Sequence, residues 1–322
     1  MNRRRFLARF ACLPALATIP WLAACGPARP LAVGIHPWIG YETLYLAREF
    51  GWLPASVELA EGKTLGDSQS ALQAGRIDAA CLTLDEVLVA RAAGVPLAVA
   101  LVFDVSAGAD VVLARSNVRS LADLAGKRIG LELNALGALM LSRLLAAAGL
   151  PASAVTLLDL PPDRQLEAWR KGEVDAVVTY EPTASLLMRE GARRLFDSRR
   201  IPDTIFDVLA VRTDRARDQR AAVESLVAGH FRALGHLQTN RQDAIYRIAA
   251  RQKITPEEVQ LSLAGVVLPS LDANRGYLAS QDTRLPHAAK TLSALMVERR
   301  LLAREDDLAG LFSSAWLPRD IT

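Results

Sequence analysis

Two short segments of the chain end in polar side chains of the kind that hold a small molecule by hydrogen bonds. Thr83 and Asp85 follow one apolar run, and Tyr180 and Glu181 follow another. Each run has the length of a buried strand, and the carboxyl end of a strand is where open α/β sheets bind ligands. Hydroxyl and carboxylate groups at that place suit the recognition of a polar solute. We therefore expect each segment to supply one wall of a binding site.

The two segments are copies of one helix–turn–strand motif. Residues 71–80 (ALQAGRIDAA) are echoed by residues 168–177 (AWRKGEVDAV), and Gly75 and Gly172 are 97 positions apart. In both copies a helix ends at the glycine, a charged residue and an Asp form the turn, and an apolar strand follows. Two copies predict two lobes that face each other. The fifth residue after the Asp is Thr in one copy and Tyr in the other, so the two walls are related but not identical.

Further candidates lie in the loop after the first predicted strand of the mature chain. Trp38, Gly40 and Tyr41 combine a flat aromatic surface with a glycine, which lets a ligand approach the backbone closely. The alternative for Trp38 and Tyr41 is that they pack the following helix onto the sheet. The alternative for Thr83 and Asp85 is that they cap a helix.

The second half of the predicted site lies near the crossing between the lobes. Glu132 and Asn134 stand between a predicted strand and helix, and Asp110 stands at the crossing, where it either contacts the solute or is a buried hydrogen-bond partner. None of these candidates is Arg or Lys. That favours a solute with an amine or an N–H-donating heterocycle over a bare anion such as nitrate, although backbone amides can hold an anion without a basic side chain.

Strands and helices alternate along the mature chain, which predicts mostly parallel sheets covered by helices on both faces. The alternation breaks at residues 104–110 and again around a return strand at 208–211. Helices are expected after that strand at 216–237, 242–250, 256–263 and 288–297. We therefore expect an α/β protein with a first lobe of residues 25–109 and 208–322, a second lobe of residues 110–207, a two-strand hinge and a helical tail.

The amino terminus is an export signal. Arg3, Arg4, Arg5 and Arg9 precede an apolar stretch that is too short to span a bilayer. The stretch ends in Leu22-Ala23-Ala24-Cys25-Gly26, which resembles the lipobox of bacterial lipoproteins. We expect residues 1–24 to be removed and Cys25 to carry a lipid that tethers the protein to the membrane. Arg3-Arg4-Arg5-Phe6-Leu7 also resembles a twin-arginine signal, which leaves open how the protein is exported.

Charge and motifs exclude several other functions. The net charge of +3 over 322 residues becomes −1 without the signal, so nucleic acid is not an expected partner. The four histidines (His36, His230, His236 and His287) show no metal spacing. Cys81 lies inside an apolar run and is expected in the core. No phosphate-binding or dinucleotide glycine pattern and no glycine-flanked Ser is present, so we expect neither an enzyme nor a cofactor.

Residues 31–274 resemble the periplasmic substrate-binding proteins of ABC importers, in the group that serves nitrate, sulfonates, taurine and thiamine-pyrimidine precursors. The matching segments are Trp38-Ile39-Gly40-Tyr41-Glu42, residues 72–78, Ser106-Ala107-Gly108-Ala109-Asp110, residues 121–130, and residues 174–177 with Tyr180-Glu181-Pro182. The resemblance implies a type II binding-protein fold. Its two lobes would close on a solute and hand it to a permease in the inner membrane, and we expect a monomer. The alternatives are a periplasmic sensor subunit and a pyrimidine-precursor enzyme on the same fold.

Overall fold

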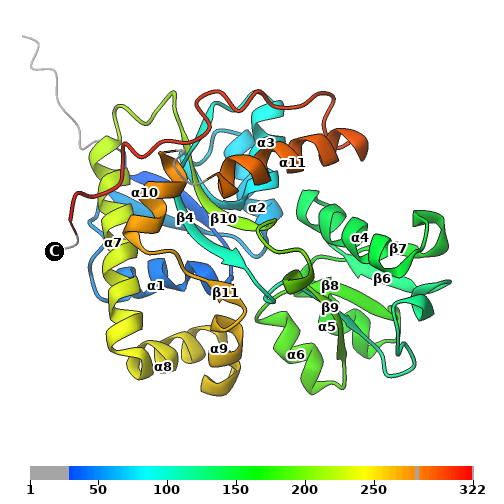
Figure 1. Cartoon of the computed structure of the whole chain (residues 1–322). Helices are drawn as coiled ribbons and strands as arrows, with labels where there is room; N and C mark the ends of the chain where they lie inside the picture. Colours follow the sequence, from blue (N-terminus) through cyan, green and yellow to red (C-terminus); the bar gives the residue numbers. More distant parts are fainter. Residues whose placement is uncertain (1–28, 280–282, 321–322) are drawn as a thin grey trace, which may run out of the picture.

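The computed structural model describes residues 29–279 and 283–320, so the export signal and Cys25 lie outside the described residues. Two sheets lie side by side, each flanked by helices (Figure 1). We call the part around the six-stranded sheet lobe 1 and the part around the five-stranded sheet lobe 2. The strands of lobe 1 are β1 (Leu31–Ile35), β2 (Val57–Glu61), β3 (Ala79–Thr83), β4 (Leu97–Ser106), β10 (Phe206–Arg212) and β11 (Val266–Val267). The strands of lobe 2 are β5 (Val111–Ala114), β6 (Arg128–Leu131), β7 (Thr156–Asp159), β8 (Ala176–Thr179) and β9 (Arg193–Asp197). The expected α/β class is confirmed.

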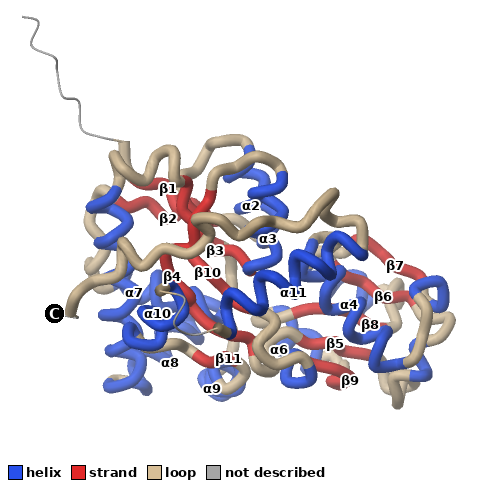
Figure 2. Tube along the Cα trace, turned by 45° about the horizontal axis from the view of Figure 1, so that its top comes forward, coloured by secondary structure: helices blue, strands red, loops and turns tan. Residues whose placement is uncertain are grey.

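Helices cover both sheets (Figure 2). Those of lobe 1 are α1 (Glu42–Glu49), α2 (Leu65–Gln73), α3 (Leu84–Ala92), α7 (Arg220–Thr239), α8 (Arg241–Gln252), α9 (Pro256–Leu263), α10 (Leu271–Leu278) and α11 (Arg284–Glu298), with the 3-10 turn η1 (Ile39–Tyr41). Those of lobe 2 are α4 (Ala135–Ala148), α5 (Pro162–Arg170) and α6 (Thr183–Arg189), with the turns η2 (Ala122–Leu124), η3 (Ala152–Ala154) and η4 (Ser198–Arg200). The four expected tail helices correspond to α7, α8, α9 and α11, and the sequence patterns missed α10.

The two lobes share one strand order. It runs β2-β1-β3-β10-β4 in lobe 1 and β7-β6-β8-β5-β9 in lobe 2, and lobe 1 adds β11 at the edge beside β4. In each lobe the first three strands are parallel, and the fourth is antiparallel to both of its neighbours. The fourth strand follows a crossing from the other lobe. Each sheet is therefore mixed, and its antiparallel strand lies next to the strand of the repeated motif.

The repeated motif has the same geometry in both lobes. Gly75 and Gly172 have φ of 67° and 72°, a left-handed conformation that suits glycine at the end of a helix. Asp78 accepts a hydrogen bond from the backbone N–H of Ala32 in β1 (3.1 Å), and Asp175 accepts one from the N–H of Arg128 in β6 (2.9 Å). Each Asp thus fixes the start of a strand against its parallel neighbour, which directs the polar carboxyl end of that strand toward the other lobe.

The two crossings are hydrogen-bonded to each other. The hydroxyls of Ser106 and Ser198 are 2.7 Å apart, and the Gly108 N–H donates to Ser198 Oγ at 2.6 Å. The Ser106 N–H also donates to the carbonyl oxygen of Ile205 at 3.0 Å. A pair of short linked segments is the structure that a hinge between two rigid lobes requires.

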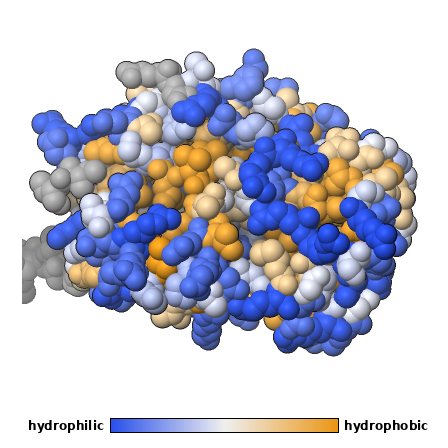
Figure 3. All heavy atoms as spheres, turned by 60° about the horizontal axis from the view of Figure 1, so that its bottom comes forward, coloured by the Kyte–Doolittle hydropathy of each residue, from blue (hydrophilic) through white to orange (hydrophobic). Residues whose placement is uncertain are grey.

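The apolar core continues from one lobe into the other. One cluster of buried side chains includes Leu88 on α3, Leu139 on α4 and Leu292 on α11, so these three helices pack where the lobes meet. Figure 3 shows the face at the bottom of Figure 1, where hydrophilic side chains surround apolar patches. In the described part of the chain, no helix has both the length and the apolar character needed to cross a bilayer.

A buried amide closes the lobe 1 sheet beside β4. Asn274 on α10 is fully buried; its Oδ1 accepts from the Val102 N–H (2.7 Å) and its Nδ2 donates to the Val102 carbonyl (3.1 Å).

We expect Asn274→Ala to lower the free energy of unfolding by about 2–4 kcal/mol in urea titrations, because it leaves two buried backbone groups without partners. Asp272→Ala, on an exposed position of the same helix, is the control. Equal stability of the two variants would contradict the assignment.

Candidate functional site

A small space lies between the lobes. A second space adjoins it through Asp110, Leu136 and Tyr180, which line both. Six of the ten predicted site residues line the two spaces, which we call the interlobe cavity: Trp38, Thr83, Asp110, Glu132, Asn134 and Tyr180. The cavity is also lined by four residues outside the ten predicted site residues: His36, Leu65, Leu136 and Asp207.

Strand ends carry the lobe 1 wall of the cavity. The loop after β1 brings Trp38, and β3 ends at Thr83. The Trp38 ring is buried, and its Nε1 donates to Asp104 Oδ2 at 2.9 Å. It meets Tyr180 from lobe 2 edge to face, with ring centroids 5.5 Å apart. Trp38 and Tyr180 therefore join the two walls directly.

Gly40 and Tyr41 stand behind this wall rather than on it. A Cβ on Gly40 would lie 1.7 Å from Asp104 Oδ2, so the glycine makes room for a carboxyl group of β4. The Tyr41 hydroxyl donates to Asp207 Oδ1 at 2.5 Å, and its ring packs against Phe103. Tyr41 therefore both packs the loop onto the sheet and orients an acidic side chain of the cavity.

Three other candidates cap or adjoin helices. The Glu181 carboxylate accepts from the N–H and the hydroxyl of Ser185 on α6, each at 3.0 Å. Asn134 Oδ1 accepts from the Gly137 N–H at 2.8 Å and so caps α4, while the residue also lines the cavity. Asp85 is buried at the start of α3 and lines a separate small space beside α4 and α11.

Two acidic residues near the ends of apolar strands complete the site. Asp104 in β4 and Asp207 in β10 are paired across the sheet. Burial, followed by the charge of Asp110, raises the pKa of Asp104 to about 8. Burial and the charge of Asp104 hold the pKa of Asp207 well above its usual range. Asp104 Oδ1 and Asp207 Oδ2 are both buried without a hydrogen-bond partner. The signal for this acid pair was a single Asp inside each of two apolar runs.

Asp110 carries the second acidic centre of the cavity. Burial, together with the charge of Asp85, raises the pKa of Asp110 to about 7, and its Oδ2 is buried without a hydrogen-bond partner. The Tyr180 hydroxyl and His36 Nδ1 are also buried and unpartnered. Burial lowers the pKa of His36 to about 3, so its imidazole is neutral. Across the described residues, no ion pair engages Asp85, Asp104, Asp110 or Asp207.

This two-lobed arrangement, with a polar cavity at the strand ends, has known counterparts. Residues 40–244 match the sequence family described as NMT1/THI5 like. The chain belongs to the NMT1/THI5-like family. No curated protein shows a significant match to it.

Solved structures share the whole fold with this NMT1/THI5-like protein. The alkanesulfonate-binding protein SsuA from Xanthomonas axonopodis pv. citri, bound to MOPS, is 25% identical with a TM-score of 0.69, over 85% of this chain and 95% of that one. The periplasmic aliphatic sulphonate binding protein SsuA from Escherichia coli is 20% identical with a TM-score of 0.70, over 90% and 99% of the two chains. The expected resemblance to periplasmic binding proteins of ABC importers is confirmed.

An enzyme also shares this fold. The desulfurization enzyme DszB is 19% identical with a TM-score of 0.66, over 90% of this chain and 97% of that one. In the NMT1/THI5-like chain, Cys81 is buried inside β3, as expected, and burial raises the pKa of its thiol. Within residues 29–279 and 283–320, no group of three His, Cys, Asp or Glu side chains could hold a metal ion.

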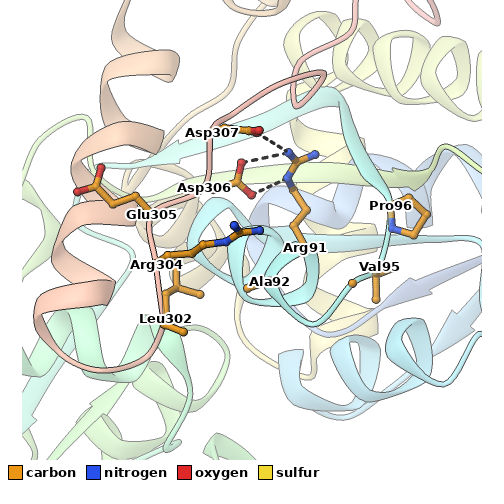
Figure 4. Close-up of a pocket in the computed structure, with 11 residues that line it drawn as sticks. Arg91, Ala92, Val95, Pro96, Leu302, Arg304, Glu305, Asp306 and Asp307 are labelled. Carbon is orange, nitrogen blue, oxygen red and sulfur yellow. Dashed lines mark hydrogen bonds and ion pairs between the residues drawn. The ribbon is translucent and has the colours of Figure 1, made fainter.

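A larger open pocket, with a volume of about 630 Å³, lies on lobe 1 between the end of α3 and residues 302–307 (Figure 4). Arg91 crosses it and donates to Asp306 Oδ2 and to the Leu97 carbonyl, each at 2.8 Å. These bonds fasten the carboxyl-terminal segment to the lobe. Unpartnered polar groups from both lobes meet in the interlobe cavity, and we place the candidate site there.

Proposed function

We propose that this protein is the solute-binding component of an ABC importer and captures a small organic solute between its two lobes. The observation that carries the proposal is the interlobe cavity, where buried and unpartnered polar groups from both lobes converge. Such convergence is typical of a ligand site and costly in an empty one. The lobes are residues 25–109 with 208–322 and residues 110–207, and delivery is to a permease in the inner membrane. SsuA proteins of the same fold bind alkanesulfonates or aliphatic sulphonates, which supports an importer role.

Contacts at the rim of the cavity support closure of the lobes as a clamp. Arg189 on α6 forms an ion pair with Glu258 on α9 at 2.6 Å. The Gly66 N–H donates to Glu132 Oε1 at 3.3 Å, which joins α2 to the loop before α4. These contacts break if the lobes separate, whereas the bonds between Ser106 and Ser198 stay within the hinge. When the lobes close, polar groups that are exposed in the open form therefore become paired across the rim.

We further propose a periplasmic, lipid-anchored location. The export signal of residues 1–24 and the lipobox ending at Cys25 support it, and the SsuA neighbour from Escherichia coli is periplasmic. A binding protein tethered beside its permease delivers solute at a high local concentration. We propose binding without catalysis, since the thiol of Cys81 lies inside the sheet and does not line the cavity.

Solute capture is testable without knowledge of the solute. We expect the small-molecule fraction of a bacterial cell extract to raise the melting temperature of the mature protein, because a ligand at 100 times its Kd adds about 2.7 kcal/mol of stability. Tyr180→Phe should need about 3–10 times more extract for the same shift, because it loses one hydrogen bond and keeps the ring.

Tyr246→Phe, which changes an exposed tyrosine on α8, is the matched control. If no extract stabilises the wild-type protein, or if a stabilising component is consumed during incubation, the proposed function is wrong.

A further inference from the structure

We propose that the solute is a small organic cation, a protonated amine or a protonated nitrogen heterocycle, whose charge lies against Asp110 and the Asp104–Asp207 pair. The inference rests on the proposed function and names the chemical class of its solute. It also separates this protein from the sulfonate-binding proteins that share its fold. Three observations support the proposal: the acidic side chains around the cavity, the contacts at the amino end of α4, and the aromatic walls of the cavity.

Carboxyl groups predominate among the ionisable side chains around the cavity. Asp110 and Asp207 line it, Asp104 is paired with Asp207, and Asp85 adds its charge from α3. No Arg or Lys is among the described residues that line it. A buried carboxylate without a partner loses its hydration and gains nothing in return. A cation in the cavity compensates that loss, whereas a sulfonate adds a like charge to it.

At the amino end of α4, the amide groups that could hold an anion are already used. The amino end of α4 lines the cavity through Asn134, Leu136 and Gly137, and a helix amino terminus is an anion site. Here Glu86 Oε1 accepts from the N–H groups of Ala135 (3.0 Å) and Leu136 (3.4 Å), and Asn134 itself accepts from Gly137. The carboxyl group of Glu86 from lobe 1 therefore occupies the position that an anionic solute would need.

The remaining walls suit an organic body. Trp38 and Tyr180 present aromatic rings, and Leu65 and Leu136 present apolar side chains. Aromatic faces attract cations, and apolar walls favour an organic cation over a hydrated ion. The unpartnered Tyr180 hydroxyl and His36 Nδ1 provide two further hydrogen-bonding positions for the polar groups of the solute.

The experiment separates the extract by charge before it is added to the mature protein. At pH 7 the extract is divided into a fraction retained by a cation exchanger, a fraction retained by an anion exchanger, and the unretained remainder. We expect the cation-exchange fraction to raise the melting temperature. Asp110→Asn should need at least about 100 times more of that fraction for the same shift, because it removes one partner of a buried charge pair.

Asp163→Asn, which removes an exposed carboxylate from the same lobe, is the matched control and should respond like the wild type. The unliganded Asp110→Asn protein should melt at or above the wild-type temperature, which shows that it is folded. Stabilisation by the anion-exchange or the unretained fraction alone, or a wild-type response of Asp110→Asn, overturns this inference and leaves the proposed function standing. If no fraction stabilises the protein, both are overturned.

Discussion

The unliganded protein should be less stable at pH 8 than at pH 5 by at least about 3 kcal/mol in urea titrations. The cause is the set of buried carboxyl groups between the lobes. Burial raises the pKa of Asp110 to about 7 and that of Asp104 to about 8. Burial and the charge of Asp85 raise the pKa of Glu86 to about 8.

The direction of this dependence follows from proton binding. Between the ordinary pKa of an acid and its raised pKa, the folded protein keeps a proton that the unfolded chain has lost. Raising the pH through this window therefore favours unfolding. The groups around Asp110 are Asp104 from β4, Asp207 from β10, Asp85 from α3, the Ser106 hydroxyl and neutral His36, and none of them is a cation.

Asp110→Asn provides the control, because it replaces the carboxyl by an amide of the same size. It should remove the Asp110 part of the slope between pH 5 and 7 and leave the contributions of Asp104 and Glu86, which extend to about pH 8. Asp163→Asn should keep the full profile. A wild-type protein whose stability is constant or rises from pH 5 to pH 8 would show that these carboxyl groups have partners that we have not identified.

Replacing Gly40 by Ala should damage both the fold and the site. The added methyl would overlap Asp104 Oδ2 and lie 2.8 Å from Trp38 Nε1, so the bond between these two side chains must break. We expect a loss of about 2–4 kcal/mol in the free energy of unfolding, from overpacking and from the lost hydrogen bond. Solute binding should be lost too, because Trp38 belongs to the lobe 1 wall and its bond to Asp104 holds it in place.

A glycine-to-alanine substitution at Gly235 should instead raise the free energy of unfolding. Gly235 lies inside α7, where an added methyl would meet no heavy atom within 4 Å, and Ala stabilises a helix interior by roughly 0.5–1 kcal/mol. Both variants are measured by urea unfolding and by the extract assay. A Gly40→Ala protein as stable as Gly235→Ala would mean that Asp104 can leave its position at little cost.

Local features of this fold could be predicted from the sequence. The helix ends at Gly75 and Gly172 and the cap at Asn134 depend on a few neighbouring residues, and all three are present in the structure. The start of α2 is also set locally, by a capping box in which Thr64 is the capping residue and Asp67 accepts from the Thr64 N–H at 3.2 Å.

Features that depend on distant pairing could not be predicted. Asp104 and Asp207 meet only because β10 inserts between β3 and β4 in one register. No pattern within either strand states that register, so the acid pair was missed although each Asp is conspicuous in its own apolar run. The use of Gly40 to admit a carboxyl group depends on the same pairing. Gly40 was identified from the sequence as a site candidate, but Asp104 was not identified as its neighbour.

The shared strand order has a consequence for the order in which the molecule can be assembled. Residues 111–197 contain every strand of the lobe 2 sheet, so that sheet can form from one continuous stretch of chain. Lobe 1 lacks an internal strand until the chain has been made as far as β10, and closing so long a connection is slow. The acid pair forms at that late step. The interlobe cavity is therefore among the last parts of the molecule to take shape.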